Sequence, residues 1–276
     1  MKIFATCLIK NEADIIGPTL EHAATWCDRI FVDDNGSDDG TWERVQELAK
    51  THPQIVPWRR KAQTFHNSIR GEAFREFRHL SSPGDWWVAL ASDEQTIDDP
   101  RQFLPRVPRW HHVVAVAQMQ YYFTEKDLEE YEKVTGSGLV PEAAHKRLHY
   151  YRPDYAETRF FRYRPGLDWP ANGAWPAHMG VMHPRLIRNR HLQYRSPEQM
   201  QKRIEVRLKA VSEGCATFRH VRDKRSWHDF LVESSSCLDD RDPSPWQIDY
   251  SKLPRFTEKP LHRAMKYLMH GSGLWA

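Results

Sequence analysis

Two pairs of acidic residues follow short apolar segments of strand type. Asp33 and Asp34 come directly after one such segment, and Asp93 and Glu94 come soon after another. Aspartate is a poor strand former, so carboxylates at the end of a buried strand need an explanation. Open α/β sheets bind ligands at the carboxyl ends of their strands. There these acids would bind Mg²⁺ or Mn²⁺, and through it a diphosphate, or accept hydrogen bonds from hydroxyl or imide donors. The simpler alternative is that they only cap helices or stabilise turns.

The elements that position these acids alternate between strand and helix over residues 1–100. Short apolar runs predict strands at 3–9, 29–32, 55–58 and 86–90. Helical spacing and helix-forming content predict helices at 13–27, 41–49 and 68–80. This alternation implies a mostly parallel sheet with right-handed crossovers. Both acid pairs would then lie on the same rim of that sheet.

The second half of the chain is less regular. Its pattern predicts strands at 113–123 and 160–164, a helix followed by a mobile loop over 124–140, a loop over 168–180, and helices at 196–213, 227–238 and 259–268. Ser196 caps the first of these later helices, Pro197 takes its first position, and Gln199 completes a capping box. The last helix is basic and amphipathic. We expect it to pack on the domain, with a peripheral contact to a membrane surface as the alternative.

The composition narrows the class of protein. The chain has 276 residues, enough for one large domain or a domain with an appendage. Its 40 basic and 37 acidic residues argue against a general nucleic-acid binder. The apolar run 3–9 is too short for a signal peptide, and no segment has the roughly 20 apolar residues of a transmembrane span. The cysteines, at 7, 27, 215 and 237, show no metal-type spacing, so we expect reduced thiols in a cytoplasmic protein.

Three ordered segments, Lys10 to Asp14, Val32 to Thr41 and Trp86 to Glu94, resemble the signature of family 2 glycosyltransferases. The resemblance is close over residues 1–100 and looser beyond. It implies an α/β fold of the GT-A type, with a Rossmann-like, mostly parallel mixed sheet flanked by helices. A glycosyltransferase domain at 1–195 would hold a nucleotide-binding half (about 1–100) and an acceptor half (about 101–195). Residues 196–276 would form a helical C-terminal extension.

The implied activity is inverting transfer of a sugar from a nucleotide-sugar donor, linked to UDP, GDP or dTDP, to an acceptor hydroxyl. Four residues at the end of the first strand would line the nucleotide pocket: Leu8, Lys10, Asn11 and Glu12. Asp33 and Asp34 would contact the base and the ribose. Arg70 stands where the family often places a basic residue after the third strand. Arg75 is a competing choice, and a solvated helix face is the simpler explanation of both arginines.

The acidic motif departs from the family pattern at one position. The family usually has Asp-x-Asp, but Ala91 takes the place of the first acid, while Asp93 keeps the position expected to bind the cation, Mn²⁺ or Mg²⁺. Metal binding would then be weaker, recruit Glu94, or be dispensable, and of these outcomes we expect a bound metal. His191, just before the Ser-Pro-Glu helix start, would complete the metal site or touch the diphosphate, unless it only packs under the helix.

The acceptor side is expected in residues 169–178, where Trp175 could stack on a sugar face and His178 is a further candidate ligand. Arg195 could neutralise phosphate charge. The base that removes the acceptor proton would be Glu94, beside the donor, or Asp168, in the acceptor-side loop, and we favour Glu94.

The sequence leaves the acceptor open among a glycan, a lipid-linked carrier, a protein and a modified nucleic-acid base. Arginine-rich stretches at 185–195 and 219–225 would suit an anionic acceptor. Two other functions compete with glycosyl transfer. A nucleotidyltransferase would also use acids and a cation, but the segment Lys10 to Glu12 is nothing like a glycine-rich phosphate loop. A degenerate transferase kept as a nucleotide- or sugar-binding module is favoured by Ala91.

Overall fold

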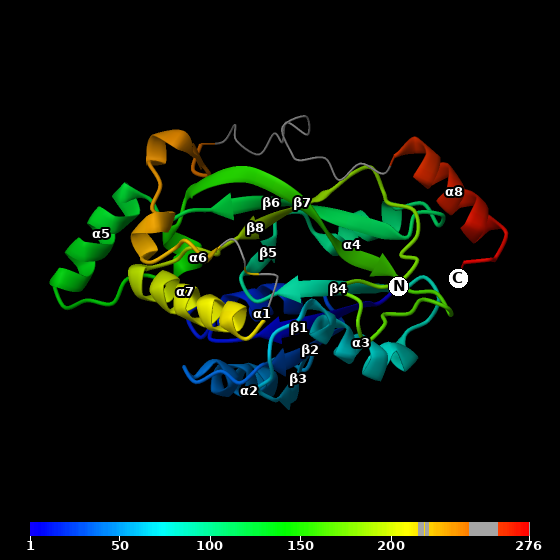
Figure 1. The fold of residues 1–276 in the computed structure, drawn as a ribbon, viewed down its shortest axis with the longest axis horizontal. Coiled ribbons are helices and arrows are strands. Elements are labelled where there is room, and N and C mark those ends of the chain that lie inside the picture. Colours follow the sequence, from blue (N-terminus) through cyan, green and yellow to red (C-terminus); the bar gives the residue numbers. More distant parts are fainter. Residues whose placement is uncertain (215–217, 219–220, 243–258, 276) are drawn as a thin grey trace.

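The computed structural model describes residues 1–214, 218, 221–242 and 259–275. Within these residues the chain forms a mixed sheet of nine strands with helices against both faces (Figure 1). The sheet runs along the length of the molecule. Helix α5 (Glu125–Gly136) lies at one end and helix α8 (Pro260–Gly271) at the other.

Most strands of the sheet run in the same direction. The nine strands are β1 (Ile3–Ile9), β2 (Arg29–Asp34), β3 (Ile55–Arg60), β4 (Trp86–Ala91), β5 (Glu94–Thr96), β6 (Val113–Tyr121), β7 (Tyr150–Arg162), β8 (Ile187–His191) and β9 (Leu238–Asp239). The order is β3-β2-β1-β4-β7-β6-β8-β5, with β9 added beside β7. Along this path only β7 and β5 run against the others. The α/β fold class with a mostly parallel mixed sheet is therefore confirmed.

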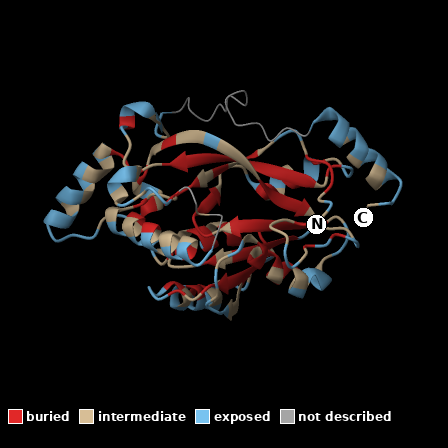
Figure 2. Cartoon of the chain, viewed as in Figure 1, coloured by how far each residue is buried: buried red, intermediate tan, exposed pale blue. Residues whose placement is uncertain are grey.

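The two faces of the sheet are covered by different helices. These are α1 (Ile16–Ala24), α2 (Thr41–Thr51), α3 (Arg70–Phe77), α4 (Pro100–Phe103), α6 (Ala144–Arg147) and α7 (Pro197–Ser212). Alternate residues of a strand point to opposite faces. Ile3 and Ala5 accordingly pack with residues of α1 and α2, whereas Phe4 packs with Phe74 of α3. Figure 2 shows the resulting buried sheet between more exposed helices.

Several predicted elements differ from the structure. The strands predicted at 3–9, 29–32, 55–58 and 86–90 are confirmed, but β5 and β8 were not predicted. The strand predicted at 160–164 is only the end of the long strand β7. The helix predicted at 227–238 is wrong. Two 3₁₀ turns, Trp227–Phe230 and Ser234–Ser236, stand there and lead into β9. Among the described residues after 195, the regular elements are the helices α7 and α8, short 3₁₀ turns and β9, which pairs with β7 of the sheet.

Helix α7 begins as predicted, but its expected capping box does not form. Ser196 Oγ accepts a hydrogen bond from the backbone N of Gln199 at 3.2 Å, and Pro197 takes the first helical position. The Gln199 side chain accepts instead from the backbone N of Arg195 at 3.2 Å, so it fixes the residue before the cap. Met200 of this helix shares a core cluster with Tyr121 of β6. The division of the chain at residues 100 and 195 stays a prediction.

Helix α8 packs on the domain, as expected, through its polar side. Lys266 Nζ donates to the carbonyl of Gly180 at 3.0 Å, and Tyr267 Oη lies 3.0 Å from His111 Nε2. Its apolar residues Leu261 and Leu268 are 79% and 72% exposed, so the apolar face points outward. Among the described residues, no helix is both long and apolar enough to cross a membrane.

The cysteines and the second arginine-rich stretch are only partly described. Cys7 and Cys27 are buried free thiols, and Cys237 is a half-buried one. Cys215 lies outside the described residues, as do the first two residues of the stretch 219–225.

Candidate active site

A cleft of about 1310 Å³ opens at the carboxyl ends of the central strands. It is bounded by the segments that follow β1 and β4, by part of β7 and by one face of α7. This is the position in which open α/β sheets bind their ligands. The cleft holds eight residues that the sequence singles out: Leu8, Lys10, Asn11, Glu12, Arg70, Asp93, Glu94 and His191.

The segments after β1 and β2 are joined by hydrogen bonds. Lys10 Nζ donates to the carbonyl of Asn35 at 2.8 Å, and Asn11 Oδ1 accepts from the backbone N of Asp38 at 2.9 Å. Asn11 has a φ of 55°, a left-handed conformation that asparagine tolerates better than most residues. The backbone N of Glu12 donates to Thr41 Oγ1 at 2.8 Å. The first two sequence motifs therefore form one connected wall of the cleft.

Asp33 and Asp34 are buried at the end of β2 but are not among the residues that line the cleft. Arg59 binds Asp33 through two hydrogen bonds, one of them from Nε at 3.0 Å. Asp34 Oδ1 accepts from both the backbone N and Oγ of Ser37 at 2.8 Å. Contact of these two acids with the base and ribose stays a prediction. The acids that do line the cleft in this region are Asp38 and Asp39.

Asp93 lies in the turn between β4 and β5 and is surrounded by cationic groups. Its Oδ1 is 3.5 Å from His191 Nε2, because the next residue, Glu94, is paired with His191 across β5 and β8. Its Oδ2 accepts a hydrogen bond from Arg203 Nη1 at 3.1 Å. Burial opposes ionisation of Asp93, but His191 and Arg203 hold the pKa of this carboxyl well below its usual value. Asp93 is therefore an ionised carboxylate whose oxygens both face cationic or imidazole groups.

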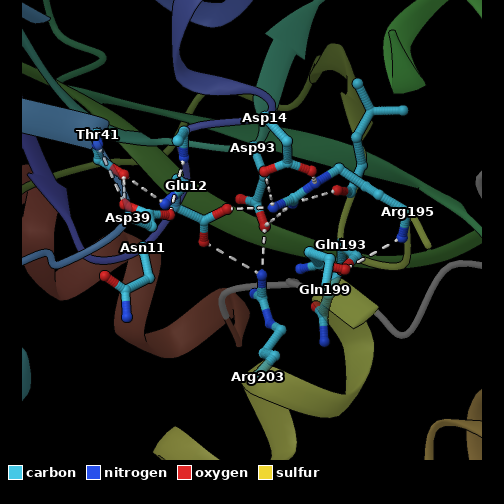
Figure 3. A network of polar contacts seen from close by, with 12 residues as sticks. Asn11, Glu12, Asp14, Asp39, Thr41, Asp93, Gln193, Arg195, Gln199 and Arg203 are labelled. Atoms are coloured by element: carbon cyan, nitrogen blue, oxygen red, sulfur yellow. Dashed lines mark hydrogen bonds and ion pairs between the residues drawn. The ribbon is translucent and has the colours of Figure 1, made fainter. Parts of the chain in front are cut away.

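Two arginines connect this turn to Glu12 on the opposite wall (Figure 3). Arg203 reaches up from α7, and its Nη1 lies 3.3 Å from Glu12 Oε1 as well as near Asp93. Arg195 donates to Glu12 Oε2 and, from Nε, to Asp14 Oδ2 at 2.7 Å. Burial raises the pKa of Glu12, and the two arginines oppose that rise.

Arg195 itself has no exposed surface and is not part of the cleft lining. Its remaining terminal nitrogen, Nη1, donates to the carbonyl of Leu192 at 2.9 Å. All three guanidinium nitrogens are thus bound within the protein. This arrangement supports a structural role for Arg195, and its predicted phosphate contact remains untested.

Glu94, the favoured base, is held by Arg159 of β7. Arg159 Nε donates to Glu94 Oε2 at 3.0 Å, and Gln118 Nε2 donates to Oε1 at 2.8 Å. Burial disfavours the charged form of Glu94, but Arg159 outweighs it and keeps the pKa of this carboxyl below its usual value. Glu94 is therefore ionised at neutral pH, as a proton acceptor must be, although the same pairing reduces its basicity.

Arg70 and Arg207 add positive charge to the cleft beside Arg203. Burial lowers the pKa of the Arg70 guanidinium, which also lies 6.0 Å from the Trp175 ring. Burial and the neighbouring Arg203 lower the pKa of Arg207 to about 9. The lowered pKa values of Arg70 and Arg207 indicate that nearby carboxylates do not fully offset the cost of burying these two charges.

The remaining predicted residues lie away from the cleft lining. Asp168 has a side chain that is 56% exposed and lies 3.5 Å from Arg78 Nη1. His178 packs against Trp275 with the two rings tilted and their centroids 4.5 Å apart. Trp175 packs near Trp169, behind Arg70. Arg75 donates to the carbonyl of Trp169 at 2.9 Å. The catalytic role of Asp168, the acceptor-side roles of Trp175 and His178 and the nucleotide contact of Arg75 stay predictions.

The sequence analysis assigned no role to several residues that line the cleft: Phe65, Gln120, Tyr155, Tyr194, Lys202, Arg203 and Arg207. For two of these residues, Arg203 and Arg207, their spacing in the sequence was informative. Arg203 and Arg207 are four positions apart on a predicted helix, so they share one face of it. Tyr155 gave no comparable signal, because the first half of β7 was not predicted.

The carboxylates around Asp93 do not fit the expected Mn²⁺ or Mg²⁺ site. Asp93 and His191 could supply two ligands, but Asp93 Oδ2 is bound by Arg203. Ala91 has no carboxylate, and Glu94 is bound by Arg159. In the part of the chain that the structure describes, no group of three or more His, Cys, Asp or Glu side chains is placed to hold a metal ion. Hard divalent cations take several oxygen ligands, which this arrangement does not offer.

Comparisons with known proteins give matches of low similarity. No family model and no curated protein matches the chain. Among solved structures it is similar to the mannosyltransferase PcManGT from Pyrobaculum calidifontis in complex with GDP-Man and Mn²⁺, with 15% identity and a TM-score of 0.43, over 78% of this chain and 65% of that one. It is also similar to TarS 1-349 from S. aureus, alone and in complex with UDP. These two matches have 13% identity, TM-scores of 0.38 and 0.37, and cover 80% of this chain and 68% of TarS.

Proposed function

We propose that this protein is a glycosyltransferase of the GT-A type that binds a nucleotide sugar in the cleft and transfers the sugar to an acceptor hydroxyl with inversion. One observation carries the proposal. The segment Lys10 to Glu12, the acidic turn at Asp93 and cationic residues of α3 and α7 converge at the carboxyl end of a mostly parallel sheet. Such a site can hold a polar, anionic ligand between hydrogen-bonding loops and guanidinium groups.

The proposed reaction is a direct displacement. The acceptor oxygen attacks the anomeric carbon, the bond from that carbon to the diphosphate oxygen breaks, and its electron pair leaves with the nucleoside diphosphate. The acceptor proton passes to a carboxylate. Of the two predicted bases, Glu94 lies on the cleft and Asp168 does not, which supports Glu94. Inversion follows from single displacement and is carried over from the sequence resemblance.

The site restricts the chemical class of the donor and of the acceptor but does not identify either molecule. UDP, GDP and dTDP sugars all share the diphosphate that the arginines would bind. Within the arginine-rich stretch 185–195, Arg188 pairs with Asp98 at 2.6 Å and Arg195 with Asp14, so much of its charge is already compensated. This favours a neutral acceptor, such as a glycan hydroxyl, over an anionic one. A cytoplasmic location fits the free thiols of Cys7 and Cys27.

A nucleotide-binding module without activity is the second candidate. Ala91 and the pairing of Asp93 with Arg203 favour it, because both remove acidic groups that a transferase of this family would use. Calorimetry with UDP, GDP and dTDP, followed by donor hydrolysis over a nucleotide-sugar panel, separates the candidates. A glycosyltransferase releases a nucleoside diphosphate from one donor, and a module binds a nucleotide without turnover. A nucleotidyltransferase transfers the nucleoside monophosphate of the donor and releases a sugar 1-phosphate. If no nucleotide binds, all three are excluded.

A further inference from the structure

We propose that Arg70, Arg203 and Arg207 neutralise the diphosphate leaving group of the donor in place of a divalent cation. The inference rests on the proposed function, because it takes a nucleoside diphosphate as the ligand of the cleft. It concerns the means of charge stabilisation, which the proposed function leaves open.

The first step concerns the place of Arg203. A metal in this cleft would bind Asp93, yet Asp93 Oδ2 receives Arg203 Nη1 at 3.1 Å. The same nitrogen lies 3.3 Å from Glu12 Oε1, so one guanidinium bridges the two acids. Ala91 cannot supply the further carboxylate that would favour a metal over this arginine. Arg203 thus takes the position relative to Asp93 that a bound cation would take.

The second step concerns donors that the protein leaves unused. Within the described chain, Arg203 Nε is buried without a hydrogen-bond partner, and only Nη1 of its terminal nitrogens contacts the acids. Arg207 lies over the Phe218 ring at 5.3 Å, and Arg70 near the Trp175 ring at 6.0 Å. In the described part of the chain, neither Arg70 nor Arg207 has a carboxylate within ion-pair distance. Half-buried guanidinium groups without counter-ions attract an anion, and their planar forks match phosphate oxygens.

The third step concerns proximity. Arg70, Arg203 and Arg207 line the same cleft as Asp93. Asp93 opposes the lowering of the Arg70 and Arg207 pKa values by burial, and Arg203 adds to the lowering of the Arg207 pKa. When the bond to the anomeric carbon breaks, the electron pair moves to the diphosphate oxygen. Fixed N–H donors at that point stabilise the developing charge without a metal.

The test is calorimetry with UDP, GDP and dTDP, in EDTA and in Mn²⁺, for the wild type and for Arg203→Gln and Arg207→Gln. Wild-type affinity should be the same in EDTA and in Mn²⁺ to within about threefold. Each variant should bind at least about tenfold more weakly, since a charge-assisted hydrogen bond is lost. Arg203→Lys should recover only part of the loss, because lysine keeps the charge but not the fork.

Controls separate this inference from the proposed function. Arg241→Gln removes an exposed arginine paired with Asp239 and should bind as the wild type does. Arg207→Gln breaks no ion pair within the described residues, so it should fold, and its melting temperature checks this. Tight binding that requires Mn²⁺ and is unchanged in Arg203→Gln and Arg207→Gln overturns the inference while the proposed function stands. Failure of every nucleotide to bind, with or without Mn²⁺, overturns both.

Discussion

Arg195 donates from Nε to Asp14 Oδ2 at 2.7 Å, across 181 positions of the chain. It ties the segment after β1 to the segment before α7, and it does so without any exposed surface. Since Glu12 accepts from the same guanidinium, Arg195 fixes the two walls of the cleft relative to one another. The binding surface therefore depends on an ion cluster that a ligand need not touch.

Loss of this cluster should reduce stability more than binding. Arg195→Ala leaves Glu12 buried beside fewer cations, and breaking a buried pair in this way lowers the free energy of unfolding by about 3–5 kcal/mol. Urea denaturation measures the change. Arg241→Gln, an exposed pair, should lower it by at most about 1 kcal/mol. If Arg195→Ala keeps wild-type stability but loses nucleotide affinity, Arg195 is a phosphate ligand after all.

Removal of Arg203 should create metal dependence. In Arg203→Ala, Asp93 Oδ2 loses its hydrogen bond and keeps only the ion pair with Arg195 Nη1 at 4.0 Å, while Oδ1 stays beside His191. A carboxylate and an imidazole are then available to a cation. We expect Mn²⁺ to raise the nucleotide affinity of this variant by about tenfold while leaving the wild type nearly unchanged. Calorimetry in EDTA and in Mn²⁺ measures both. If Mn²⁺ changes the nucleotide affinity of the two proteins equally, Arg203 does not replace a metal ion beside Asp93.

Substitution of Glu94 should change both the stability of the protein and its rate of turnover. Glu94→Gln removes the charge that compensates Arg159, so the free energy of unfolding should fall by about 3 kcal/mol. If Glu94 is the base, turnover should also fall by about 10²–10⁴ at unchanged donor affinity. Asp168→Asn, at an exposed position outside the cleft, should keep both the stability and the rate. A normal rate in Glu94→Gln would place the base elsewhere.

Gly36 should be required for the wall formed by the segments after β1 and β2. It has a φ of 77°, and an added Cβ would lie 2.6 Å from Ala62 Cβ. Gly36→Ala should therefore lower the free energy of unfolding by about 1–3 kcal/mol, through both strain and overlap. Gly84→Ala is the matched control, because its φ is 96° and nothing lies within 4 Å of the added Cβ. Equal losses in thermal denaturation would mean that only backbone strain matters.

Acid should weaken the histidine-rich region where α8 docks. Burial, with His111, Arg185, Arg263 and Arg162, lowers the pKa of His183 to about 4. Burial, with Arg164, His270, Arg162 and His111, lowers that of His112 to about 3. Both pKa values are lower than that of histidine in an unfolded chain, which is about 6.5. Between the folded-state and unfolded-state pKa values, the unfolded protein therefore binds more protons than the folded protein does.

Stability should thus be unaffected by these groups above about pH 6.5 and should fall as the pH drops from there toward 4. Thermal unfolding across this range measures the slope. His183→Gln, which cannot be protonated, should make the slope shallower. An unchanged slope would contradict the contribution of His183.

Strands that are almost wholly buried were predicted from the sequence, whereas a strand that is only partly buried was not. Strands β1 and β4 are apolar and almost wholly buried, so composition alone indicates them. Strand β8 alternates buried and half-exposed residues and carries Arg188 and Arg190, whose partners Asp98 and Asp240 come from distant segments. No local pattern reveals such partners. Ser226 and Asp229 do form a capping box, but the turn they start ends at Phe230 and does not become the predicted helix.

At the site, too, contacts between segments far apart in the chain could not be predicted from the sequence. Strand ends in a parallel sheet share one rim, and the structure brings Lys10 to Glu12 and Asp93 into one cleft, although Asp33 and Asp34 do not line it. His191, which the resemblance placed beside them, lies in the same cleft. Arg203 could not be linked to Asp93 in this way, since the contact depends on how α7 packs 110 positions later in the chain. The consequence for the metal site was therefore visible only in three dimensions.

Incubation with a panel of UDP-, GDP- and dTDP-linked sugars and simple glycan acceptors, in EDTA, tests the central claim most directly. Proton NMR would follow the anomeric configuration, and chromatography the released nucleotide. We predict that one donor yields a nucleoside diphosphate and a product of inverted configuration, and that Arg207→Gln slows the reaction. Failure to turn over or bind any donor, with or without Mn²⁺, would contradict the account.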